Sequence, residues 1–177
     1  MIVAIYGVYY LATGQNADYS SMMHTVLLII HEAGHPIMGL TGSRTLMILG
    51  GTLFQVVIPA MFVVYFIRSR QMFSAAIILY WTGFSLLDVS VYVSDAKARV
   101  LPLLGGDPDE HDWYNLFTMW GCLDYAREIG TCVAACGAVI VLLAMAWSFA
   151  ECFRRPEDTT ILNVLYRMRG FLDHENN

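Results

Sequence analysis

Charged side chains are scarce in this sequence. Asp, Glu, Lys and Arg make up 14% of its 177 residues, whereas soluble proteins carry about 25%. Hydrophobic residues reach 57% and the mean hydropathy is +0.54. A water-soluble domain of this length could not hide so much apolar surface, but a bilayer solvates it. The composition therefore excludes an ordinary soluble globular protein and predicts one membrane-embedded domain.

Basic patches and paired cysteines are also missing. Without a basic patch, nucleic acid is not an expected partner. The N-terminus lacks the positive region of a cleavable signal, since the first basic residue is Arg44, so we expect the chain to be retained whole. The cysteines form no CxxC pair and no disulfide framework: Cys122, Cys132, Cys136 and Cys152. Cys132 and Cys136, four residues apart, fit small helix-packing residues better than a soft metal site.

Four apolar segments approach the ~20 residues that a helix needs to cross the hydrocarbon. They are residues 21–40, 46–67, 72–94 and 130–153. Residues 2–12 predict a short apolar helix, and residues 154–177 an amphipathic tail with an apolar stripe at helical spacing. The expected fold is all-α, a polytopic membrane helix bundle with four spanning helices. Residues 1–153 form the membrane domain and residues 154–177 a cytoplasmic tail.

The distribution of Lys and Arg predicts the orientation of the bundle. Six of these residues lie on one side: Arg68, Arg70, Arg154, Arg155, Arg167 and Arg169. Four lie on the other: Arg44, Lys97, Arg99 and Arg127. The positive-inside rule then puts the C-terminus in the cytoplasm and the acidic, aromatic loop of residues 97–128 outside. We expect this loop to fold back onto the membrane surface.

Residues 31–35, His-Glu-Ala-Gly-His, match the HExxH pattern within the first predicted span. Residues four apart lie on nearly the same helix face, so His31 and His35 can converge on one cation. Glu32 points about 100° round the helix, close enough to accept a proton from a water activated by Zn²⁺. Ionisable side chains are costly inside a bilayer and mark functional sites. The pattern predicts a metal site, with an interhelical hydrogen-bond network or a proton relay as alternatives.

A catalytic zinc usually takes three protein ligands, and Asp88 is the predicted third. Two spans separated by a single span run in the same direction. His35 lies about 14 residues into its span and Asp88 about 16 into its own, so at 1.5 Å per residue they reach similar depths. The alternative for Asp88 is a structural hydrogen bond to a neighbouring helix.

Three further residues carry weaker predictions. Asp95 is a candidate ligand if its helix is tilted, with end-of-span solvation as the alternative. His111 is a candidate ligand if its loop folds inward, with a solvated histidine as the alternative, and Asp112 could then orient its ring. His24, two turns before His31, is expected to be a pore or interface residue.

These motifs resemble the site-2 protease family of intramembrane zinc metalloproteases. Residues 31–35 match the HExGH motif of the family. Leu87-Asp88 resembles its Leu-Asp-Gly motif, although Val89 stands in place of the Gly. Residues 50–55, Gly-Gly-Thr-Leu-Phe-Gln, resemble its motif of small residues and Asn, with Gln55 at the Asn position. The resemblance covers about residues 21–95 and extends to small bacterial membrane proteins with this motif set.

The resemblance implies Zn²⁺ bound by His31, His35 and Asp88, with Glu32 as general base. It implies a metalloprotease of the bacterial inner membrane that hydrolyses peptide bonds of membrane-embedded or membrane-adjacent substrates. Expected partners are the lipid bilayer and a membrane-protein or peptide substrate, with oligomerisation left open. The alternatives are a non-catalytic metal-binding scaffold or sensor derived from the protease fold, and a metal-dependent hydrolase or oxidoreductase acting on lipids. Two His and a carboxylate suit Zn²⁺ and also fit Fe²⁺.

Overall fold

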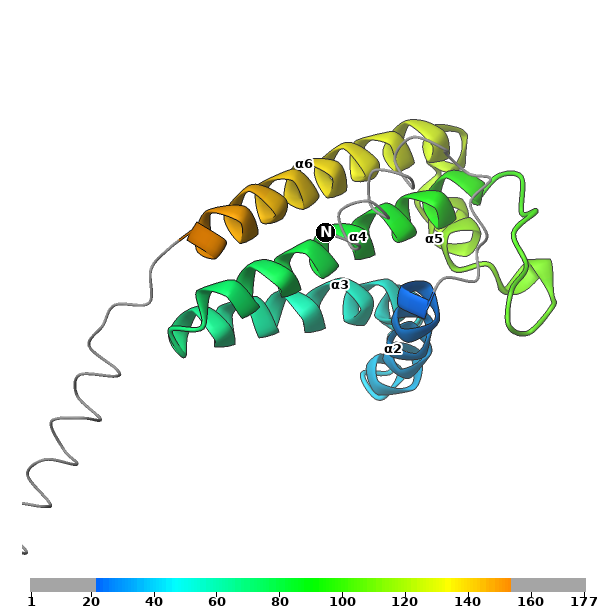
Figure 1. Cartoon of the computed structure of the whole chain (residues 1–177). Helices are drawn as coiled ribbons and strands as arrows, with labels where there is room; N and C mark the ends of the chain where they lie inside the picture. Colours follow the sequence, from blue (N-terminus) through cyan, green and yellow to red (C-terminus); the bar gives the residue numbers. More distant parts are fainter. Residues whose placement is uncertain (1–21, 154–177) are drawn as a thin grey trace, which may run out of the picture.

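The structure, a computed structural model, describes residues 22–153, and every regular element in that range is helical (Figure 1). The long helices are α2 (Met22–Gly39), α3 (Arg44–Arg68), α4 (Met72–Asp95) and α6 (Ala126–Phe153). Between α4 and α6 lie η2 (Pro108–Glu110), α5 (Asp112–Trp120) and η3 (Leu123–Tyr125). The all-α prediction is thus confirmed for this range. The helix predicted at residues 2–12 and the tail at residues 154–177 lie outside the described residues.

Three helices in the described range are long and apolar enough to cross a membrane: Arg44–Arg68, Met72–Asp95 and Leu123–Phe153. They coincide with the second, third and fourth predicted spans and indicate a membrane protein. The first predicted span, α2, is not among them. Its 18 residues reach only about 27 Å, and its polar HExxH residues lower its hydropathy. The structure therefore supports three of the four predicted spans.

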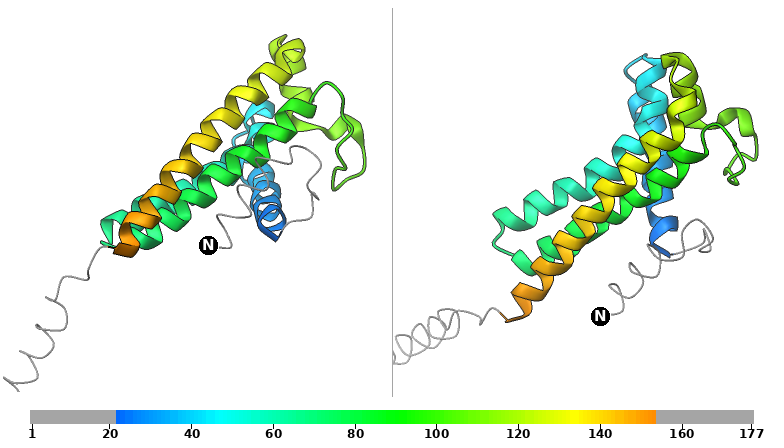
Figure 2. Two further views of the ribbon diagram at one scale, coloured as in Figure 1. Left: turned by 45° about the horizontal axis from the view of Figure 1, so that its top comes forward. Right: turned by 90° about the horizontal axis from the view of Figure 1, so that it is seen from above.

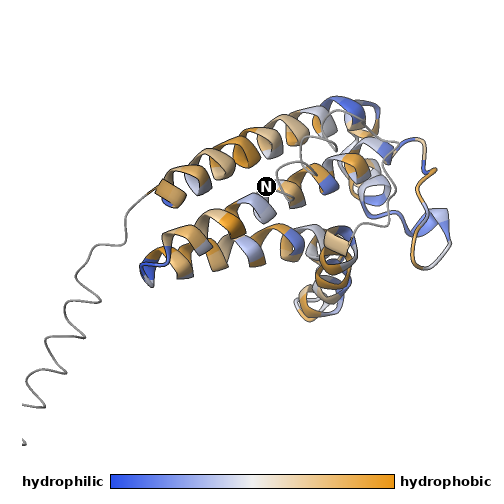
Figure 3. Cartoon of the chain, in the orientation of Figure 1, coloured by the Kyte–Doolittle hydropathy of each residue, from blue (hydrophilic) through white to orange (hydrophobic). Residues whose placement is uncertain are grey.

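Helices α3, α4 and α6 run side by side, and α2 crosses them obliquely near one end (Figures 1 and 2). The central helix is α4, because 61% of its apolar window is buried, against 33% for α3 and 22% for α6. Much of the surface left exposed on α3 and α6 is apolar, including Met61 and Leu143. Figure 3 shows this apolar colour along the helices, with hydrophilic residues gathered towards their ends. Such surfaces suit contact with lipid.

Glycines allow the helix backbones to approach closely. A Cβ atom on Gly83 of α4 would lie 2.8 Å from the backbone nitrogen of Val141 on α6. Helices α2 and α3 cross at Gly34 and Gly50, where a Cβ on Gly50 would lie 2.6 Å from the carbonyl oxygen of Gly34. Small residues commonly permit such contacts between membrane helices. The HExxH helix is thereby held directly against α3.

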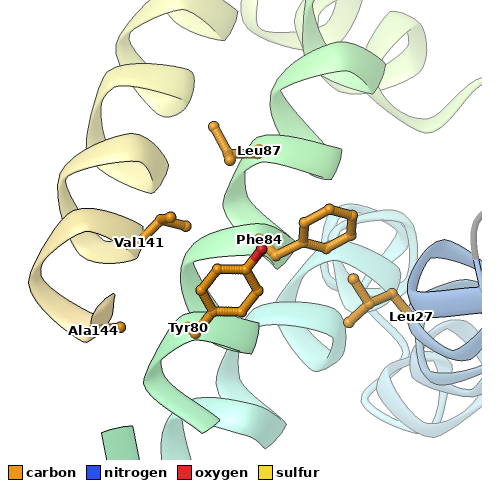
Figure 4. Packing of buried hydrophobic residues seen from close by; sticks show 6 residues of the cluster. All are labelled: Leu27, Tyr80, Phe84, Leu87, Val141 and Ala144. Carbon is orange, nitrogen blue, oxygen red and sulfur yellow. The ribbon is translucent and has the colours of Figure 1, made fainter. Parts of the chain in front are cut away.

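Two buried clusters fix the other contacts. The first joins α2, α4 and α6 (Figure 4) and consists of Leu27, Tyr80, Phe84, Leu87, Val141 and Ala144. The second docks α5 onto the bundle, because Phe117 is buried with Val93 of α4, Ala96 directly after α4, and Ala126 of α6. The α4–α6 connection thus folds onto the end of the helices, which brings the first residue of α5 to the HExxH motif.

Candidate metal centre

The HExxH residues gather on α2 as their spacing predicts. The ligand atoms of His31, Glu32 and His35 all lie within 4.8 Å of one another, and the two imidazole centroids are 4.9 Å apart. His31 is buried at 5% exposure, where an ionisable group needs partners. This group could hold a metal ion.

Outer hydrogen bonds determine which nitrogen of each imidazole carries a proton. The Nδ1 of His31 lies 2.9 Å from the Oε1 of Gln55, and the Nδ1 of His35 lies 3.0 Å from the carbonyl oxygen of Met47. Both oxygens only accept hydrogen bonds, so each Nδ1–H donates. The amide of Gln55 cannot be turned round, because its Nε2 donates to the carboxylate of Asp88 at 2.7 Å. In the neutral imidazoles, the lone pairs therefore lie on Nε2.

One carboxylate contacts both Nε2 atoms. The Oδ2 of Asp112 lies 2.9 Å from the Nε2 of His31 and 3.4 Å from the Nε2 of His35. Asp112 is the first residue of α5, and its backbone N–H donates to the hydroxyl of Tyr92 at 3.0 Å. The sequence makes Asp112 a candidate partner for the ring of His111, whereas the structure brings its side chain to the two motif histidines.

Asp88 lies one hydrogen bond away from the motif. Its Oδ2 accepts from Gln55, and its Oδ1 accepts from the Nδ1 of His24 at 2.7 Å. A chain of hydrogen bonds therefore runs from His24 through Asp88 and Gln55 to His31. The depth count that paired Asp88 with His35 assumed parallel helices, whereas α2 crosses α4 obliquely and presents His24 to Asp88 instead. The role of Asp88 as a ligand stays a prediction.

Asp95 and His111 meet each other at the end of α4. The Nε2 of the fully buried His111 lies 3.5 Å from the Oδ2 of Asp95, whose carboxylate also accepts from the backbone N–H groups of Val100 and Leu101. The Nδ1 of His111 accepts from the backbone N–H of Tyr114 and caps α5. Burial lowers the pKa of His111, and the negative charge of Asp95 opposes this shift. The two side chains thus anchor the start of α5, one residue before Asp112.

A cavity of about 1030 Å³ opens beside the motif, at the upper end of the ~300–1,000 Å³ usual for ligand sites. His31, Glu32 and His35 line it on one side. Residues 101–104, Leu-Pro-Leu-Leu, line it from the α4–α6 connection, together with Glu110. An apolar chain can lie against residues 101–104 while a polar group reaches Glu32.

In comparisons with known proteins, no protein-family model, no curated protein and no solved structure matches this chain. The geometry itself defines the class of site. It consists of two imidazoles that lie beside carboxylates, at the side of a cavity in an apolar helix bundle. The Nδ1–H group of each imidazole donates a hydrogen bond.

Sequence reasoning missed how Gln55, His24 and Asp112 take part. Gln55 was noted only for its place in a motif. A buried amide in an apolar span needs a partner, and this signal could have linked it to His31. For Asp112 the signal was weaker, because residues 107–112 contain four acids and nothing local shows which one turns inward.

Proposed function

We propose that this chain is a zinc-dependent hydrolase that cleaves peptide bonds of membrane-embedded or membrane-adjacent substrates, with His31 and His35 holding the ion. One observation carries the proposal. Both Nε2 lone pairs face the same carboxylate oxygen, beside Glu32, at the side of a large cavity. Imidazole nitrogens with carboxylate oxygens form a donor set that suits zinc.

Zn²⁺ held there would supply a Lewis acid that polarises a carbonyl group and makes water more acidic. The carboxylate of Glu32 would accept a proton from the attacking water as the new C–O bond forms. It would then pass that proton to the amine as the C–N bond breaks. Gln55 and Met47 keep the two imidazoles in the orientation that this arrangement needs.

The Lys and Arg distribution and the family resemblance support a bacterial inner membrane location with a cytoplasmic C-terminus. The cavity would then open on the outer face, because the α4–α6 connection lines it. The orientation is tested with Asp109→Cys, at an exposed position, in a variant whose four native cysteines are replaced by alanine. An impermeant maleimide should label this cysteine in intact spheroplasts. Labelling only after the membrane is broken would contradict this orientation.

The test of hydrolysis uses purified, Zn²⁺-loaded protein in detergent micelles. Synthetic transmembrane peptides of varied sequence are incubated in H₂¹⁸O, and the products are read by mass spectrometry. Hydrolysis places one ¹⁸O atom in each new carboxylate. The Glu32→Gln variant should cleave about 10²–10⁴-fold more slowly, the usual contribution of general base catalysis, and still bind Zn²⁺. The matched control is Glu110→Gln, which changes another carboxylate of the same cavity.

Cleavage by Glu32→Gln at the wild-type rate would contradict the assigned base. Stoichiometric Zn²⁺ binding without any cleavage would overturn hydrolysis. It would instead favour the alternative, a non-catalytic metal-binding scaffold or sensor.

A further inference from the structure

We infer that Asp112, rather than Asp88, is the third protein ligand of the metal, and that Asp88 acts through Gln55 to orient His31. This inference rests on the proposed metal binding by His31 and His35. The α4–α6 connection would then contribute a ligand to the metal site.

The positions of the protons support this assignment. Since Nδ1–H of His31 donates to Gln55 and Nδ1–H of His35 donates to Met47, both neutral rings present a lone pair at Nε2. Each lone pair faces the same anionic oxygen, the Oδ2 of Asp112. Such atoms repel one another unless a positive charge lies among them. Protons could bridge both contacts only if both rings were imidazolium cations, with their centroids 4.9 Å apart, whereas one metal ion satisfies both contacts at once.

The distances from Asp112 to the two imidazoles fit a common ion. Four ligand atoms at ~2.0–2.1 Å from a tetrahedral zinc lie about 3.3–3.4 Å from one another. The distances from the Oδ2 of Asp112 to the two Nε2 atoms are 2.9 Å and 3.4 Å. The contact with His35 is already at ligand spacing, and a shift of a few tenths of an ångström at His31 would bring the other contact to it. The fourth position would remain for water or substrate, as in catalytic zinc sites.

The surroundings of Asp112 hold its carboxylate in place. Its backbone N–H is bonded to Tyr92, and the preceding residue, His111, is completely buried and caps α5. Its side chain is 13% exposed, so water screens it little. Phe117 anchors the same helix in the bundle. Asp112 is therefore positioned by the fold before any ion binds.

Both oxygens of Asp88 have other partners. Oδ1 accepts from His24 and Oδ2 accepts from Gln55, each at 2.7 Å. Gln55 in turn fixes the ring of His31. Carboxylates in such outer positions orient metal-ligating histidines, and their loss typically costs about 10–100-fold in metal affinity. Asp88 is thus a positioning residue, and its loss should lower the metal affinity by no more than about 100-fold.

The test measures Zn²⁺ affinity by competition with a chelating dye, using full-length protein in micelles. Asp112→Asn keeps the shape of the side chain and should lower the affinity by more than the roughly 100-fold upper range of an outer partner. Asp88→Asn should stay within that range. Asp109→Asn makes the same change in the same connection, on a side chain that is 83% exposed and paired with Arg99, and should leave the affinity unchanged. Circular dichroism should show wild-type helix content in all three variants.

Co²⁺ gives a second readout that does not depend on affinity. Its visible d–d bands report ligand type and geometry, so Asp112→His, which replaces one ligand atom by another, should change the spectrum while the ion stays bound. Asp88→Asn should leave the spectrum as in the wild type. A spectrum altered by Asp88→Asn and not by Asp112→His would overturn the inference.

The outcomes separate this inference from the proposed function. If His31→Ala loses the metal but Asp112→Asn binds it as Asp109→Asn does, the third ligand is another residue and the metal site stands. If His31→Ala and His35→Ala both retain wild-type affinity, the proposed metal binding is wrong, and the assignment of Asp112 fails with it.

Discussion

Replacing Gly51 by alanine tests the position of the His31 imidazole without substituting any proposed ligand. A Cβ atom at Gly51 would overlap the Nε2 of His31 and lie 2.6 Å and 2.7 Å from its Cδ2 and Cε1 atoms. Ordinary contacts between such atoms are ~3.5–4.0 Å, so the ring would have to move by about 1 Å. Metal–ligand distances vary by only about 0.2 Å. Zn²⁺ affinity should therefore fall at least as far as after loss of an outer partner, about 10–100-fold.

The assay is the same dye competition, with Gly39→Ala as the matched control. A Cβ at Gly39, also near the α2–α3 contact, would meet only the side chain of Met47 at 3.5 Å or more, an ordinary contact. This control should bind Zn²⁺ like the wild type. Wild-type affinity in Gly51→Ala, with unchanged helix content, would refute the idea that the Nε2 of His31 must lie against Gly51 to bind the ion.

Three further predictions concern the stability of the fold and the hydrogen bonds around the proposed metal site. Gly34→Ala should lower the thermal unfolding temperature in micelles, because its Cβ would overlap the carbonyl oxygen of Gly50. The free energy of unfolding should fall by about 1–3 kcal/mol, the usual range for overpacking. An unfolding temperature equal to that of Gly39→Ala would contradict the close crossing. Gln55→Leu should weaken Zn²⁺ binding about 10–100-fold, since it removes the acceptor for His31, and an unchanged affinity would exclude that role. Lys97→Ala should leave the unfolding temperature unchanged from pH 5 to 9. Pairing with Asp124 raises the pKa of Lys97, so its ammonium group stays charged throughout this range, and water screens the pair because both side chains are exposed; a clear drop would contradict this.

The sequence was a good guide to whatever depends on neighbouring residues. Apolar length is a local property, so the predicted spans at residues 46–67 and 72–94 match Arg44–Arg68 and Met72–Asp95 closely. The last helix begins earlier than predicted, at Ala126, because polar residues at its start are still compatible with helix. The convergence of the HExxH imidazoles is also local, since it follows from one turn of helix.

The contacts of the site could not be read in this way, because they join distant segments. The count of residues that paired Asp88 with His35 treated the helices as parallel cylinders. Instead, α2 crosses α3 closely at Gly34 and Gly50 and lies obliquely to α4 (Figures 1 and 2). The direction in which the helices cross thus decides which carboxylate reaches which histidine, and no periodicity in either helix carries that information.

The contact of Asp112 with His31 joins residues 81 positions apart, and its existence depends on the burial of α5 rather than on the HExxH motif. Phe117 inserts among α4 and α6 residues, and His111 caps the helix that follows it. An ion shared by Asp112 and His31 would tie α5 to α2, because it binds only when both are in place. Metal binding and docking of the connection are then coupled, and Zn²⁺ at 100 times its Kd would stabilise the docked state by about 2.7 kcal/mol. The ion that the proposed reaction requires would thus also keep the α4–α6 connection docked beside the cavity that it lines.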